Sequence, residues 1–230
     1  LGHIDPLIAA VQTHASIRYG FKDRNAFCTD SFRYISQSKL SASEGFDRGL
    51  KERLLTLAHQ LESSPQALIS QGGQSAGNLF LLNDPAINKI KGIIESRITH
   101  YREKYQQSQA GLISKWPSQT TLHGWFIDLK KGGSLGLHMH KEGWLSGSIY
   151  LKLCKLEGSS EGNIIFDLDG VLWNSSDIHN DCFRKALIYY NFDMSLKVSF
   201  KCGILNFTVK LLVSKVLVIY LILKFNGLEA

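Results

Sequence analysis

Residues 131–150, KGGSLGLHMHKEGWLSGSIY, place two histidines directly before a run of β-forming residues. In an extended strand, residues i and i+2 point to the same face. His138 and His140 can therefore aim both imidazoles at one point, as a metal ion requires. Glu142 follows two residues later and is a further candidate ligand. The segment predicts a metal site, and the alternative is a pair of histidines with an ordinary surface or core role.

The residues on either side of the histidines predict short antiparallel strands. Residues 122–129 alternate between apolar and polar side chains, and residues 135–140 and 145–153 predict two further strands. The glycine-containing stretch at 130–133 predicts a turn, and Gly143 separates the last two strands. Short antiparallel strands joined by glycine turns are typical of a β-sandwich or jelly roll.

Helices are predicted in the first half of the chain. Residues 46–61 and 84–107 carry apolar side chains at helical spacing, and Asp84 followed by Pro85 is a good start for the second helix. The Gly/Ser stretch 70–78 predicts a flexible loop, either structural or in contact with a substrate. The fold class is therefore predicted to be α+β, with helices packed on an antiparallel, jelly-roll-like sheet (a double-stranded β-helix).

The composition is that of a globular protein, with 44% hydrophobic and 20% charged residues among 230 and a formal net charge of +6. The basic residues are scattered, so no nucleic-acid partner is expected. The four cysteines are widely spaced without a CxxC pair, which predicts neither a zinc ribbon nor a disulfide scaffold. A reducing cytoplasm is therefore the expected location.

Several separate segments agree, in order, with one known family. They are QSAGNLF at 74–80, GLISKWP at 111–117, GWFIDLKKGG at 124–133, the HMH segment, and GWLSGSIY at 143–150. Together they resemble a family of 2-oxoglutarate/Fe(II)-dependent oxygenases, over about residues 60–165. The resemblance implies Fe(II) and 2-oxoglutarate as cofactors, and a protein or small molecule as substrate.

The same resemblance implies roles for individual residues. His138 and His140 would be metal ligands, and Ser148 and Tyr150 would face the 2-oxoglutarate pocket. The family also has a distal histidine and an arginine that binds the 2-oxoglutarate carboxylate as a fork. After residue 164 this chain has a single histidine and a single arginine, His179 and Arg184, in no matching strand context. The sequence therefore predicts an incomplete metal site.

A second resemblance begins where the first ends. NIIFDLDGVL at 163–172 resembles the first motif of haloacid dehalogenase-like phosphatases, in which a parallel strand ends at two carboxylates that bracket a phosphate and Mg²⁺. Asp167 would be the nucleophile and Asp169 the general acid/base. No aspartate follows Asp193, so the later acidic pair that would hold Mg²⁺ is predicted to be missing.

Four segments follow from these patterns. They are an N-terminal helical or irregular region at 1–60, a truncated oxygenase-like domain at 61–162, a phosphatase-like βα fragment at 163–193 and an apolar tail at 194–230. The two resemblances meet near residues 161–166, which suggests a fusion at this point.

The tail has an apolar, β-branched stretch at 204–223 that is interrupted by Asn206, Lys210 and Lys215. A membrane helix needs about 20 apolar residues, and a central lysine costs roughly 2.5–3.5 kcal/mol on insertion scales. A membrane span is therefore disfavoured, and a buried strand, a buried helix or an out-of-frame tail remain as alternatives.

Three hypotheses on function remain open. The first is a 2-oxoglutarate/Fe(II)-dependent dioxygenase of the hydroxylase type, with an incomplete site. The second is a Mg²⁺-dependent haloacid dehalogenase-like phosphatase fragment, and the third is a non-catalytic fusion remnant.

Overall fold

The computed structural model describes residues 6–28, 31–138, 140, 143–153, 165–167, 197–202, 206–210 and 215–225. The helices are α1 (Pro6–Tyr19), α2 (Arg48–Gln60), α3 (Pro85–Lys104) and α4 (Gly111–Ser114), with 3₁₀ turns η1 (Ser31–Tyr34), η2 (Ala42–Glu44) and η3 (Leu79–Leu81). The strands are β1 (Ser36–Lys39), β2 (Ser63–Ser64), β3 (Ile69–Ser75), β4 (Thr120–His138), β5 (Gly143–Leu153), β6 (Ile165–Asp167), β7 (Lys197–Cys202), β8 (Asn206–Lys210) and β9 (Lys215–Phe225).

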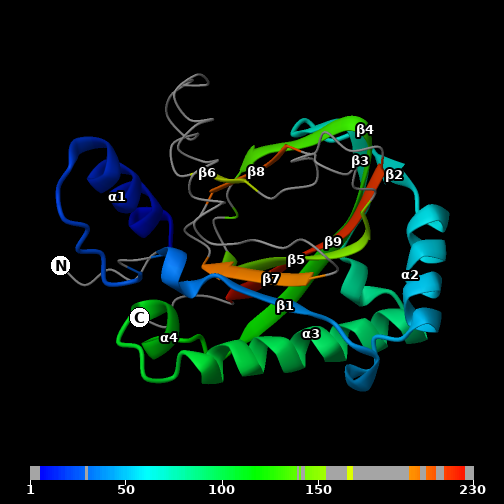
Figure 1. Ribbon diagram of the computed structural model, residues 1–230, viewed down its shortest axis with the longest axis horizontal. Coiled ribbons are helices and arrows are strands. Elements are labelled where there is room, and N and C mark those ends of the chain that lie inside the picture. The colour runs from blue at the N-terminus through cyan, green and yellow to red at the C-terminus, as the bar shows by residue number, and fades with distance from the viewer. Residues whose placement is uncertain are drawn as a thin grey trace.

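The described strands form one sheet in the order β1-β7-β5-β9-β4-β3-β2, in which every pair is antiparallel. The long strand β4 pairs with β9 along residues 120–130, and near its end with β8, which in turn pairs with β6 (Figure 1). β4 therefore carries the chain from the main layer into a smaller second group of strands. The predicted combination of helices with an antiparallel sheet is confirmed, and closure into a jelly roll stays a prediction.

The two helices predicted from apolar spacing are both present. The carboxylate of Asp84 accepts a hydrogen bond from the backbone N–H of Ala86 at 2.8 Å, and Pro85 occupies the first turn of α3. These residues satisfy the free N–H groups of the first turn and set its backbone angle. α3 ends at Lys104, slightly before the predicted residue 107. Its buried stripe includes apolar residues at helical spacing, Ile87, Ile90, Ile94, Ile98 and Tyr101.

Helices α2 and α3 cover one face of the main layer (Figure 1). Their apolar stripes join side chains of β4, β5 and β9 in one hydrophobic cluster. Ile94 of α3, Leu145 of β5 and Ile219 of β9 are fully buried within it. The helix-facing side of the sheet is therefore the core of the protein.

Two predictions based on glycine were wrong. Residues 130–133 are not a turn, because β4 continues through them as strand. The stretch 70–78 is not a flexible loop, because residues 70–75 belong to β3. A Cβ on Gly72 would lie 2.3 Å from the carbonyl oxygen of Asp128. Glycine therefore serves here for close approach of two strands, which its sequence pattern cannot distinguish from flexibility.

The apolar tail is part of the sheet. β9 lies between β5 and β4, and Ile219 pairs with Ile149 on one side and Phe126 on the other. Of the alternatives for this stretch, the buried strand is therefore what the structure shows. In the described residues no helix is long and apolar enough to cross a membrane.

The strand predicted before the Asp-Leu-Asp motif is present as β6, but its pairing differs from the prediction. Ile165 and Phe166 pair antiparallel with β8, so the parallel strand expected of a phosphatase motif is wrong. A strand of three residues can form its hydrogen bonds with any neighbouring strand edge, parallel or antiparallel. Here the neighbouring strand β8 runs in the opposite direction. The helix predicted at 178–191, with His179 and Arg184, lies outside the described residues.

Candidate functional site

The face of the main layer opposite the helices carries the candidate residues. Directly paired residues of antiparallel strands point to the same face. Trp125 of β4 and Ser148 of β5 both pair with Tyr220 of β9, so they share one face. The neighbouring residues Phe126 and Ile149 belong to the core cluster on the other face.

Ile127 and Tyr150, each two residues further along its strand, lie on the same face, because both pair with Val218 of β9. The side chain of Ser148 is 7% exposed and that of Tyr150 is 5% exposed. The two residues predicted to face the co-substrate therefore lie beside each other on a buried, partly polar surface. The side-chain hydroxyls of serine and tyrosine can both donate hydrogen bonds to carboxylate oxygens.

His140 lies at the edge of this surface, just beyond the end of β4. Its imidazole stacks on the indole of Trp125, with ring centroids 6.1 Å apart and an interplanar angle of 14°. Its carbonyl oxygen accepts a hydrogen bond from the backbone N–H of Gly143 at 2.9 Å. The turn is tight, because a Cβ on Gly143 would lie 3.0 Å from Cγ2 of Ile222 and 3.1 Å from the His140 oxygen. The backbone and the ring of His140 are thus both held in place.

Two residues that the sequence did not single out fix the strand around Trp125. Ser75 Oγ accepts a hydrogen bond from the backbone N–H of Phe126 at 3.0 Å. Asn78 Oδ1 accepts one from Gly124 N–H at 3.0 Å, and Asn78 Nδ2 donates to the Leu122 carbonyl at 3.1 Å. These side chains continue the ladder where β3 ends, so the backbone on both sides of Trp125 stays satisfied. Both lie within the segment QSAGNLF at 74–80, whose sequence alone does not indicate this role.

The strand geometry predicted for the histidine pair is realised only in part. His138 is the last residue of β4, whereas His140 lies outside the strand. The side chain of His138 lies outside the described residues, as does Glu142. The prediction that both imidazoles share one face, and the assignment of His138, His140 and Glu142 as ligands, therefore stay predictions.

A complete set of metal ligands is not present among the described residues, which contain no group of three His, Cys, Asp or Glu side chains placed to hold a metal. His138 pairs with Phe207 of β8, and the sequence of β8, NFTVK, offers neither an imidazole nor a carboxylate. The strand β8, which pairs with His138, therefore does not supply the distal histidine of the family, for which the sequence also offered no matching candidate.

The phosphatase-like residue Asp167 lies on the smaller group of strands, on β6, which pairs with β8. Asp167 is the last residue of β6, where it pairs with Asn206 of β8. Asp169 lies outside the described residues. Their predicted roles as nucleophile and acid therefore stay predictions.

Comparison with solved structures identifies the class of fold. The structure is similar to a prolyl-4-hydroxylase from Pseudomonas putida, with a TM-score of 0.54 and 13% identity over 95% of this chain and 100% of that chain. It is also similar to the viral collagen prolyl hydroxylase of Paramecium bursaria Chlorella virus-1 in its 2-oxoglutarate complex, with a TM-score of 0.50 and 10% identity over 84% of this chain and 97% of that chain.

A third similar structure is HygX from Streptomyces hygroscopicus with nickel and 2-oxoglutarate bound, with a TM-score of 0.50 and 10% identity over 84% of this chain and 83% of that chain. No protein-family model and no curated protein matches the sequence. At these identities the similarity shows the fold alone, which this chain shares with the two prolyl hydroxylases and HygX.

Proposed function

We propose that this protein is a 2-oxoglutarate/Fe(II)-dependent dioxygenase of the hydroxylase type with a weak metal site. The observation that carries the proposal is the sheet face shared by Ser148, Tyr150 and Trp125, where Ser148 lies in register with Trp125, the stacking partner of His140. The fold that surrounds this face is the one found in the prolyl hydroxylases. The substrate is a protein or a small molecule.

In this proposal His138 and His140 hold Fe(II), with Glu142 as a third candidate, and Ser148 and Tyr150 contact 2-oxoglutarate. Imidazole nitrogen is a suitable ligand for iron, and the site would leave positions open for a co-substrate. Two imidazoles without a fixed third ligand bind a metal more weakly than a complete set. The phosphatase alternative, with Asp167, Asp169 and Mg²⁺, is not proposed, because no comparison favours it and β6 is antiparallel.

Anaerobic titration with Fe(II) or Co(II) tests the metal site. The wild-type protein should bind weakly, and His138→Ala and His140→Ala should each reduce the binding further or abolish it. His100→Ala is the matched control, since His100 is an exposed histidine on α3 beside Glu103. Unchanged binding in both site variants would remove the proposed metal site.

Binding of 2-oxoglutarate to the metal-loaded protein tests the second half of the proposal. Tyr150→Phe removes a single hydroxyl from this face, and it should weaken 2-oxoglutarate binding by about tenfold to a hundredfold, the value of one hydrogen bond to a charged group. Tyr101→Phe is the control, because the Tyr101 hydroxyl donates to the Tyr34 carbonyl at 2.7 Å, away from this face. Little or no succinate is expected, and equal 2-oxoglutarate affinity in Tyr150→Phe and wild type would contradict the co-substrate assignment.

A further inference from the structure

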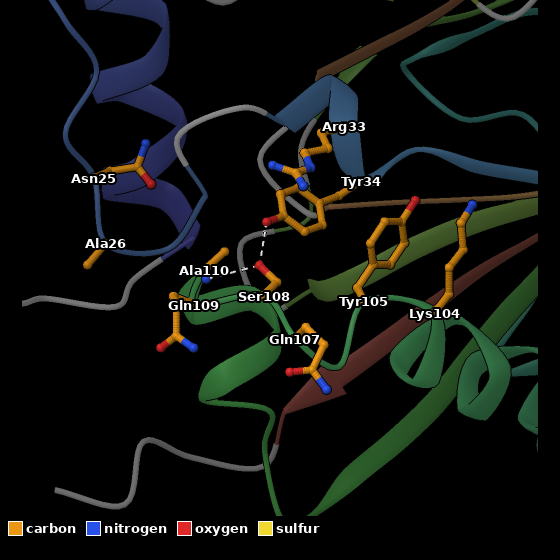
Figure 2. A pocket seen from close by; sticks show the side chains of 10 residues that line it. All are labelled: Asn25, Ala26, Arg33, Tyr34, Lys104, Tyr105, Gln107, Ser108, Gln109 and Ala110. Atoms are coloured by element: carbon orange, nitrogen blue, oxygen red, sulfur yellow. Dashed lines mark hydrogen bonds between the residues drawn. The ribbon is translucent and has the colours of Figure 1, made fainter.

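A cavity of about 540 Å³ lies away from the candidate site, on segments that belong to neither β4 nor β5 (Figure 2). One wall comes from Asn25, Ala26, Arg33 and Tyr34, and the other from Lys104, the last residue of α3, and from residues 105 and 107–110 that follow it. Pockets for small molecules commonly measure about 300–1,000 Å³. The cavity therefore has the size of an organic molecule and is larger than an inorganic ion needs.

The two walls are joined by hydrogen bonds. The backbone N–H of Gly111 donates to the Ala26 carbonyl at 2.8 Å, and the backbone N–H of Leu112 donates to the Phe27 carbonyl at 2.9 Å. The Leu112 carbonyl in turn accepts a hydrogen bond from the indole N–H of Trp144 at 3.0 Å. Hydrogen bonds thus connect the two walls to each other and to Trp144 at the start of β5.

Two tyrosines form a fixed apolar surface in the cavity. The rings of Tyr34 and Tyr105 lie 5.1 Å apart at an interplanar angle of 53°. The Tyr34 hydroxyl shares a hydrogen bond of 2.5 Å with Ser108 Oγ, which also accepts from the Ala110 N–H at 3.1 Å (Figure 2). Because these side chains are already ordered, a ligand that contacts them loses little affinity to the ordering of the protein.

Two cations line the cavity, one on each wall. Figure 2 shows Arg33 beside Tyr34 and Lys104 beside Tyr105. The Lys104 ammonium lies 5.0 Å from the Tyr105 ring centroid and 3.5 Å from Ser36 Oγ. Both side chains belong to exposed residues, and within the described part of the chain neither forms an ion pair with a carboxylate. None of the lining residues is acidic.

The end of α3 opposes this charge only weakly. A helix C-terminus carries about half a negative charge on its free carbonyls. Here the carbonyls of Arg102 and Glu103 accept hydrogen bonds from the backbone N–H groups of Tyr105 and Gln106. A carboxylate also lies behind one wall, because the lining residue Asn25 donates hydrogen bonds to Asp23 at 2.9 Å, but Asp23 does not itself line the cavity. With Arg33 and Lys104 as its charged members, the lining carries a net positive charge.

We propose that this cavity binds a small organic anion, a molecule whose carboxylate or phosphate oxygens lie on a compact carbon skeleton. The planar guanidinium of Arg33 can donate two parallel hydrogen bonds to the oxygens of such an anion, and the ammonium of Lys104 supplies a second positive charge. The Gln107 and Gln109 side chains offer neutral donors and acceptors to the skeleton, which rests on the tyrosine rings.

Calorimetric titration with citrate, glucose 6-phosphate and glucose at low ionic strength tests this proposal. At least one of the two anions should bind, and glucose should not. The preferred anion identifies the source of the oxygens, carboxylate or phosphate. Arg33→Gln and Lys104→Gln should each weaken its binding about tenfold, because each removes a charge-assisted contact. Arg33→Lys keeps the charge and should lose less than Arg33→Gln.

Arg48→Gln and Lys91→Gln are the matched controls, since both remove an exposed helical cation far from the lining residues and should leave the affinity unchanged. The proposal is overturned if neither anion binds at millimolar concentration, if glucose binds as well as the anions, or if both cavity variants keep the wild-type affinity while their melting temperatures are unchanged. None of these outcomes bears on the oxygenase proposal, because β4 and β5 contribute no lining residue.

Discussion

The helix α3 and the strand β9 both reach the core of this protein, but the sequence indicates the helix much more clearly than the strand. In α3 apolar residues recur at helical spacing between charged ones, because its other face meets water. In β9 the sequence KVLVIYLILKF is apolar almost without interruption. Both of its edges are paired, and the consecutive residues Ile222 and Leu223 are both buried.

A strand buried on both faces loses the alternation by which strands are recognised. Such a run is consistent with a buried strand, a buried helix or a membrane segment, and only its partners decide. Here β4 and β5 supply eleven and nine paired positions along β9, and they lie on its two edges. An element buried on one face can therefore be recognised from its sequence periodicity. An element buried on both faces lacks this periodicity, so its sequence does not show whether it is a strand or a helix.

Three isoleucine-to-alanine variants give the largest expected effect and compare the two elements directly. Ile94 in α3 and Ile219 in β9 are both 0% exposed, whereas Ile8 in α1 is 52% exposed. Ile94→Ala and Ile219→Ala should each lower the free energy of unfolding by about 2–5 kcal/mol, and Ile8→Ala by less than about 0.5 kcal/mol. Denaturant unfolding measures all three.

The pattern of the three values matters more than any one of them. If Ile219→Ala behaves like Ile8→Ala while Ile94→Ala is strongly destabilised, β9 is a tail and not the centre of the sheet. That result would support the predicted boundary at residue 194, which separates an apolar tail from the rest of the chain. The domain boundaries themselves stay predictions.

The sequence predicted more of the fold than of the site, for physical reasons. Asp84, Pro85 and the α3 stripe act through local rules, caps and periodicity, which do not depend on distant residues. The glycines of 70–78 and 130–133 misled because glycine permits both a turn and a close strand contact. Which of the two it serves is decided by the strand that packs beside it.

The candidate site shows the same division. Ser148 and Tyr150 lie two residues apart on β5, so their shared face followed from strand geometry. The contact of His140 with Trp125 joins residues 15 apart, and Asn78 reaches Leu122 over 44 residues. These contacts depend on how β3, β4 and β5 are arranged, which no local pattern specifies.

Gly143→Ala tests the contact between β9 and the histidine turn. The added Cβ would lie 3.0 Å from Ile222 Cγ2 and 3.3 Å from His140 Cβ, closer than ordinary packing allows. We expect a loss of about 1–3 kcal/mol in the free energy of unfolding, together with weaker metal binding as the turn moves. Equilibrium unfolding and the cobalt titration measure the two effects.

Gly92→Ala is the matched control within α3. A Cβ at Gly92 meets nothing within 4 Å, and the position is a helix interior. Alanine should therefore stabilise the protein by about 0.5–1 kcal/mol. If both substitutions had the same sign, the tight approach of β9 to the turn would be wrong.

The smallest expected effect concerns the charge at the start of α3. Burial acts to raise the pKa of Asp84, but hydrogen bonds from the Arg53 side chain and the Ala86 N–H, with the Arg53 charge, lower it below its usual value. A carboxyl group whose pKa is lower in the folded state stabilises that state above its unfolded pKa, and this contribution is lost as the pH falls through the folded pKa. Asp84→Asn keeps a good capping residue and removes the charge.

The variant Asp84→Asn should therefore be less stable than wild type by up to about 1 kcal/mol at pH 7, as expected for a partly exposed ion pair with Arg53. The difference should shrink as the pH falls below about 4, where wild-type Asp84 also loses its charge. Unfolding curves between pH 2 and 7 measure it, at roughly unit steps. In an Arg53→Gln background the pH-dependent part should become smaller, because the partner charge is gone. A difference that is the same at every pH would show that the charge of Asp84 contributes nothing, and that α3 depends on its cap and its apolar stripe alone.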